Sequence, residues 1–159
     1  MPSLSRAELR ALGRRPPQPV KQPGEWLAVF VSGRLVNLKN RRMHYYAQAR
    51  YKREWRDRVA MALVATGWRL PGRPHRQPLI VTLRASVGRL MDSQDGLPMA
   101  LSPVVDALGE CGVLTGLRER PGVGDEPGRG HLFAYEQILA PAAPGVELRV
   151  RPAAAPITL

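Results

Sequence analysis

Residues 89–108 read RLMDSQDGLPMALSPVVDAL and join an acidic turn to the most regular helical pattern of the chain. Apolar residues recur at offsets 0, 4, 7, 8 and 11, the spacing of one helix face: Leu97, Leu101, Val104, Val105 and Leu108. Asp95 is placed to cap this helix, Pro98 suits its first turn, and Gly109 and Gly112 suit its end. The stretch predicts that a strand runs through an acidic turn into a helix.

The remainder of the chain predicts a second helix and several strands. Short β-prone runs bounded by glycine or proline predict strands at residues 26–32, 78–87, 131–139 and 146–150. Residues 41–66 have a helical period, and Gly67 is expected to stop this helix. Its apolar stripe contains Trp55, Val59, Ala62 and Leu63. The order β-α-β-α-β-β predicts an α+β domain, a small mixed β-sheet with two main helices.

Length and composition predict one folded domain between two loose ends. The 159 residues divide into a flexible Pro/Arg-rich arm at 1–24, a folded domain at 25–150 and a tail at 151–159. One cysteine, Cys111, excludes an intrachain disulfide and a multi-cysteine zinc site, and it is expected to be a small buried hydrophobe. Without an apolar run of membrane length or a signal-peptide core, we expect a cytoplasmic protein that does not enter membranes.

The charge balance favours a polyanionic partner. Lys and Arg number 24 against 13 Asp and Glu, a formal net charge of +11. A balance of this size predicts attraction to nucleic acid. Clustered carboxylates at residues 92–95 repel one another, and a bound cation best explains their proximity. A small acidic cluster in a basic protein therefore indicates a divalent ion acting on a phosphodiester.

Residues 34–58 combine basic and aromatic side chains. Nine of them are basic: Arg34, Lys39, Arg41, Arg42, Arg50, Lys52, Arg53, Arg56 and Arg58. Tyr45, Tyr46, Tyr51 and Trp55 are interleaved with these residues. Lys and Arg can neutralise phosphates, and aromatic rings can stack on unpaired bases. The alternative is a solvated helix face whose aromatic residues belong to the core.

Four segments together resemble the RusA family, small and often phage-borne Holliday junction resolvases. They are Asn40–His44 (NRRMH), Lys52–Arg56 (KREWR), Asp95–Leu108 and Phe133–Gln137 (FAYEQ), and the resemblance covers roughly residues 26–150. It implies a RusA-like fold and a homodimer that binds branched DNA, including four-way junctions. It also implies Mg²⁺ held by aspartates, with Mn²⁺ as a substitute, and paired nicking of opposed strands.

The resemblance implies specific site residues. In the family the turn reads Asp-x-Asp-Asn-Leu; Asp95 matches its second aspartate, Asp106 matches that of the later Asp-Ala-Leu, and Asp125 matches a loop acid further on. Asp92 can serve as the first aspartate if the turn is shifted. On a continuous helix Asp106 lies about 16 Å from Asp95, so Asp92, Asp95 and Asp125 are the expected catalytic metal ligands and Asp106 has a supporting role. The expected DNA-binding residues are Asn40, Arg41, Arg42, Lys52, Arg53, Arg56 and Arg89.

The chain departs from the family pattern at three positions. Ser93 stands at the first aspartate, Gly96 at the asparagine and Ser102 at a helix lysine. A lysine there could reach the scissile phosphate and serine cannot; Lys52, Arg89 and Arg129 are the candidates to replace it. The alternative function is therefore a catalytically weakened or inactive branched-DNA-binding protein. A basic RNA-binding or ribosome-associated protein would explain the charge but not the acidic turn.

Each singled-out acid and histidine also has an ordinary interpretation. Asp95 can be a plain helix N-cap, and Asp92 and Asp125 can be turn residues. His44 and His131 are interpreted as surface or packing residues rather than catalytic ones.

Overall fold

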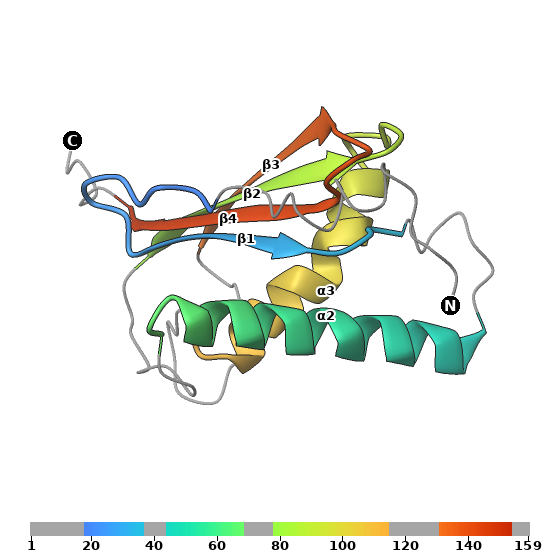
Figure 1. Ribbon diagram of the computed structural model, residues 1–159, viewed down its shortest axis with the longest axis horizontal. Coiled ribbons are helices and arrows are strands. Elements are labelled where there is room, and N and C mark those ends of the chain that lie inside the picture. The colour runs from blue at the N-terminus through green and yellow to red at the C-terminus, as the bar shows by residue number, and fades with distance from the viewer. Residues whose placement is uncertain (1–17, 37–43, 69–77, 115–130, 154–159) are drawn as a thin grey trace, which may run out of the picture.

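Four strands form one sheet, and two helices cover one of its faces (Figure 1). The computed structural model describes residues 18–36, 44–68, 78–114 and 131–153. The element order confirms the α+β fold expected from the sequence, with two helices and a mixed sheet. The elements are β1 (Leu27–Ser32), α2 (Tyr45–Ala65), β2 (Leu79–Val87), α3 (Gly96–Glu110), β3 (Leu132–Leu139) and β4 (Gly145–Pro152).

The strands lie in the order β1-β4-β2-β3. The last strand, β4, is antiparallel to both β1 and β2, whereas β3 is parallel to β2. A parallel pair needs a crossover connection, and α3 belongs to this one. In the register Ser32 lies opposite Gly145, which lies opposite Ser86. The C-terminal ends of β1 and β2 therefore meet at the same end of the sheet.

The core lies between the sheet and the two helices. From α2 it receives Trp55, Val59 and Leu63, three residues of the predicted stripe. From α3 it receives Leu97, Leu101, Val104 and Leu108, which confirms the second stripe. The strands contribute alternate residues, because successive side chains of a strand point to opposite faces. Cys111 is buried, as expected.

Most helix and strand ends follow the predicted signals, but the helix expected from residue 41 begins at Tyr45, after its N-cap His44. The first helix ends at Ala65, and Gly67 then takes the left-handed φ of 88° that favours glycine. The final strand reaches Pro152, two residues beyond the expected end at Val150. In the described part of the chain, no helix is long and apolar enough to cross a membrane.

The expected arm is described only from residue 18. Gln18 lies along the edge strand β1, where its Oε1 accepts from the Phe30 N–H at 3.0 Å and its Nε2 donates to the Phe30 carbonyl at 3.4 Å. These two bonds give hydrogen-bond partners to the N–H and the carbonyl of Phe30, on a strand at the edge of the sheet. Residues 1–17 of the arm and 154–159 of the tail lie outside the described residues.

Candidate functional site

The acidic turn lies between the end of β2 and the start of α3. The Asp92 carbonyl accepts the Leu97 N–H at 2.8 Å, which closes the turn, and the Asp95 carbonyl accepts the Met99 N–H at 3.2 Å, as in the first turn of a helix. Two carboxylates three residues apart are therefore carried on one short connection. The strand-to-helix context predicted for them is confirmed.

Asp92 has a structural role in this turn. Its Oδ1 accepts the N–H of Gln94 at 2.9 Å, the hydrogen bond of an aspartate that stabilises a turn two residues ahead. The interpretation of Asp92 as a turn residue is therefore correct. Its Oδ2 lies outside this hydrogen bond, so the turn does not by itself prevent Asp92 from being a metal ligand.

Asp95 occupies the predicted N-cap position of α3, but it does not cap the helix through its side chain. Its side chain makes no cap hydrogen bond to the helix. The backbone explains this: φ −115° and ψ −48° place Asp95 in a helical region of ψ, whereas a capping residue normally has the extended backbone that aims its side chain at the first turn.

The surroundings can accommodate two carboxylates without a metal. Asp92 and Asp95 lie next to the N-terminus of α3, where the helix dipole favours negative charge. Within residues 18–36, 44–68, 78–114 and 131–153, no group of three or more His, Cys, Asp or Glu residues could hold a metal ion. The third expected ligand, Asp125, lies outside the described residues.

Gln137, the last residue of the segment Phe133–Gln137, fixes the residue that precedes the turn, a role that the sequence interpretation did not give it. From β3, its Oε1 accepts the Met91 N–H at 2.9 Å and its Nε2 donates to the Met91 carbonyl at 2.7 Å. Because an amide side chain carries both an acceptor and donors, this one residue binds both polar groups of one backbone unit, as a neighbouring strand would. A signal was present: Gln137 is a polar residue on the strand face that also carries Phe133 and Tyr135.

A groove between α2 and α3 gathers the predicted basic residues of α2. It has a volume of about 270 Å³ and is lined by Ala49, Lys52, Arg53, Arg56, Pro103, Asp106, Ala107 and Glu110. Arg56 forms an ion pair with Glu110 at 3.5 Å. The groove begins at Pro103, about two helical turns from the start of α3. The structure therefore brings together Lys52, Arg53 and Arg56, but on a helix interface rather than at the acidic turn.

Asp106 belongs to this groove. Partial burial raises the pKa of its carboxyl above the ordinary value, and the positive charge of Lys52 opposes that rise. The Asp106–Lys52 attraction agrees with a supporting electrostatic role for Asp106. Because α3 is one continuous helix from Gly96 to Glu110, Asp106 and Asp95 are separated along it as expected.

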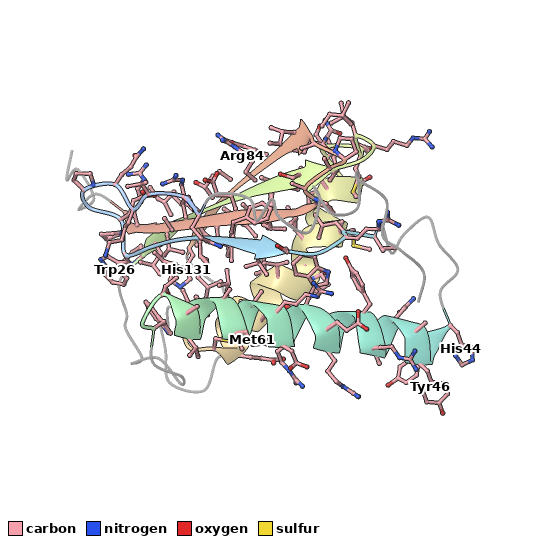
Figure 2. All side chains as sticks on the ribbon, in the orientation of Figure 1. Trp26, His44, Tyr46, Met61, Arg84 and His131 are labelled. Atoms are coloured by element: carbon pink, nitrogen blue, oxygen red, sulfur yellow. The ribbon has the colours of Figure 1, made fainter. Side chains whose placement is uncertain are left out.

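The aromatic residues of α2 divide into two groups. Tyr51 and Trp55 are core residues, with Trp55 only 2% exposed, and the Tyr51 hydroxyl accepts the Val36 N–H at 2.9 Å. Base stacking by these two is therefore excluded, and the alternative that they belong to the core is correct. Tyr45 and Tyr46 are 76% and 74% exposed, and Tyr46 stacks on His44 at the helix start (Figure 2). Of these four aromatic residues, only Tyr45 and Tyr46 could stack on a nucleic acid base.

The face of the sheet opposite the helices carries paired charges. Figure 2 shows Arg84 on this face, on the far side of the sheet from Met61 of α2. Arg84 pairs with Glu136 at 3.0 Å and with Glu147 at 3.7 Å. Arg149 pairs with Glu25 at 2.7 Å and with Glu147 at 3.3 Å. This face is thus largely neutralised within the protein.

The remaining residues singled out from the sequence are Arg89 and the histidines. Arg89 is exposed just after β2, beside a cavity that it shares with Arg34. His131 is a packing residue, since it is buried and its Nδ1 accepts the Leu79 N–H at 3.0 Å. His44 is the N-cap of α2. Asn40, Arg41, Arg42 and Arg129 lie outside the described residues.

Two comparisons with known proteins, a scan against protein-family models and a search of curated proteins, gave no match. The function must therefore be argued from the acidic turn and from the cations around it.

Proposed function

We propose that this protein is a Mg²⁺-dependent, structure-selective DNA endonuclease that resolves four-way junctions and other branched DNA by paired nicking. The observation that carries the proposal is the position of Asp92 and Asp95 on one turn between β2 and α3, in a chain of net charge +11. The resemblance to the RusA family supplies the reaction class. The proposed process is DNA recombination or repair, in the cytoplasm of a bacterial or phage-infected cell.

The acids fit the chemistry of the proposed ion. Mg²⁺ prefers carboxylate oxygens and water as ligands. Asp92, through Oδ2, and Asp95 would hold the ion together with Asp125. When bound, the ion would lower the pKa of a water and stabilise negative charge on the phosphate. Gln137 would fix the backbone just before Asp92, and so help to set the position of that carboxylate.

The basic residues would hold the DNA. Lys52 and Arg53 on α2 would contact phosphates of the junction arms, and Arg89 would contact a phosphate close to the acidic turn. Arg56 already pairs with Glu110, so its contribution would require that exposed pair to open, at a cost of about 0–1 kcal/mol. Two symmetric nicks need two sites, and a homodimer with twofold symmetry provides them.

The test is cleavage of a synthetic four-way junction with Mg²⁺ or Mn²⁺. Asp95→Asn should reduce the nicking rate by about 100-fold or more, because changes even to residues around a metal ligand cost about 10- to 100-fold. The matched control is Asp57→Asn, which removes an exposed carboxylate of α2 that lies 3.9 Å from Arg56. Wild-type protein that binds the junction and cuts with neither ion would show the enzymatic proposal to be wrong.

The second candidate is a branched-DNA-binding protein without catalysis, and the structural role of Asp92 in its turn favours it. Its Oδ1 is already used in the turn, and the helix lysine of the family is replaced by Ser102. Calorimetric titration with Mg²⁺ separates the two candidates. Heat that disappears in Asp95→Asn supports the nuclease, whereas junction binding without metal-dependent heat or cleavage supports the binding protein.

A further inference from the structure

A cavity of about 290 Å³ lies at the end of the sheet where β1 and β2 both end. Its walls come from the segment after β1, from the end of β2 and from the connection between β3 and β4. The lining residues are Arg34, Leu35, Ser86, Val87, Gly88, Arg89, Met91, Pro141 and Pro144. A cavity of this size is near the lower limit for small-ligand sites, so it suits a single sugar–phosphate unit rather than a duplex.

The cavity combines apolar walls with two arginines from separate segments. Arg34 follows β1 and Arg89 follows β2, and both are exposed. In the described part of the chain neither guanidinium pairs with a carboxylate, unlike Arg84 and Arg149 on the open face of the sheet. Two guanidinium groups at one cavity are suited to a phosphate, which arginine binds through paired hydrogen bonds.

The cavity also borders the residue that precedes the acidic turn. Its wall includes Met91, and Asp92 is the next residue. The backbone of Met91 is held by both polar atoms of Gln137, so the wall shared by the cavity and the turn has a fixed position. A nucleotide chain whose phosphate lies at Asp92 and Asp95 would place its next sugar–phosphate unit within reach of this cavity.

We propose that this cavity is a nucleotide subsite, in which Arg34 and Arg89 bind the phosphate next to the one at the acidic turn. The apolar walls, Leu35, Val87 and Pro141 among them, contact the deoxyribose. This subsite rests on the proposed function, because it gives the position of the DNA strand relative to the acidic turn. It assigns a role to Arg34 and gives Arg89 a defined ligand.

The experiment compares two double variants that each remove two positive charges. Arg34→Gln/Arg89→Gln alters the cavity, and Arg84→Gln/Arg151→Gln alters the open face of the sheet. Affinity for a four-way junction is measured against salt concentration in EDTA, so that no cleavage occurs. Each phosphate contact contributes about 0.9 to the slope of log K against log salt. The subsite holds one phosphate, so the cavity variant should lower the slope by about 0.9 and the affinity about tenfold, and the control should change neither.

A second measurement detects the phosphate at the arginines directly. The side-chain Nε–H signals of ¹⁵N-arginine-labelled wild-type protein are followed while a thymidine dinucleotide is added. The subsite predicts that the Arg34 and Arg89 signals shift and that the Arg84 signal does not. Equal shifts of all three signals, or none, would overturn the subsite.

The outcomes separate the subsite from the proposed function. If wild type binds and cuts junctions and the two double variants behave alike, the subsite is wrong and the nuclease stands. If binding depends on Arg34 and Arg89 but no metal gives cleavage, the subsite stands and the nuclease is wrong. Wild-type protein that does not bind DNA overturns both.

Discussion

Replacing Gln137 with leucine tests whether the acidic turn is held by β3. Leucine is similar in size but can make neither of the hydrogen bonds to Met91, which measure 2.9 and 2.7 Å. A hydrogen bond of this type contributes about 0.5–1.5 kcal/mol net, so the two together predict a loss of about 1–3 kcal/mol. For a chain of this length each kcal/mol lowers Tm by roughly 2–4 °C.

The assay combines urea unfolding with hydrogen exchange. Urea unfolding gives the free-energy difference between Gln137→Leu and wild type. Exchange of the Met91 amide reports on the turn itself, and its protection should fall in the variant because its acceptor is lost. If the nuclease proposal is right, nicking should fall by about tenfold to 100-fold, since small displacements of catalytic groups have effects of that size.

The control is Glu136→Gln, the adjacent residue on the other face of β3. It weakens only the exposed ion pair with Arg84, a type of pair that contributes about 0–1 kcal/mol. Should Gln137→Leu match Glu136→Gln in both stability and Met91 protection, Gln137 does not hold the turn, and the reasoning from these two hydrogen bonds is refuted.

Two further predictions concern stability. The pKa of Asp106 is raised in the folded protein above its ordinary value of 3.8, so the unfolded chain loses this proton first as pH rises. Just above pH 3.8, wild type should therefore lose stability relative to Asp106→Asn. Urea unfolding across this pH range measures whether the difference in the free energy of unfolding grows with pH. At Gly145, a Cβ would overlap the Phe30 ring and lie 2.5 Å from the Val31 carbonyl oxygen, whereas at Gly88 the nearest atom is 3.8 Å away. Gly145→Ala should cost about 1–3 kcal/mol in a thermal melt, and an equal effect of Gly88→Ala would contradict the steric explanation.

The elements were predictable because local patterns specify them. The apolar stripe that ends at Leu108 follows from the helical spacing of buried residues. The glycine at position 67 follows from the left-handed φ that the residue after a helix often needs. The strand order was not predictable in this way, because the insertion of β4 between β1 and β2 depends on pairing between residues far apart in the sequence. Trp55 had two interpretations, and the core one is correct because a large ring gains more from full burial than from exposure.

The site was only partly predictable, because side-chain partners depend on the fold. The acidic turn lies where the sequence placed it, between a strand and a helix. That Asp95 does not cap its helix follows from a backbone angle that the residue type does not determine. The bonds from Gln137 to Met91 join β3 to the connection that follows β2, and the two residues are 46 apart in the sequence. They therefore depend on the parallel pairing of β2 with β3.

The distribution of paired charges indicates where a polyanion can approach. At physiological salt, charges are screened beyond about 8 Å, so local clusters matter more than the net charge of +11. The open face of the sheet is neutralised by the pairs of Arg84 and Arg149. At the end of β2, Arg34 and Arg89 line a cavity that does not include Asp92 or Asp95, so they can attract a phosphate without a metal. A divalent cation at Asp92 and Asp95 would add positive charge, and a phosphate and the cation would then strengthen each other's binding at the acidic turn.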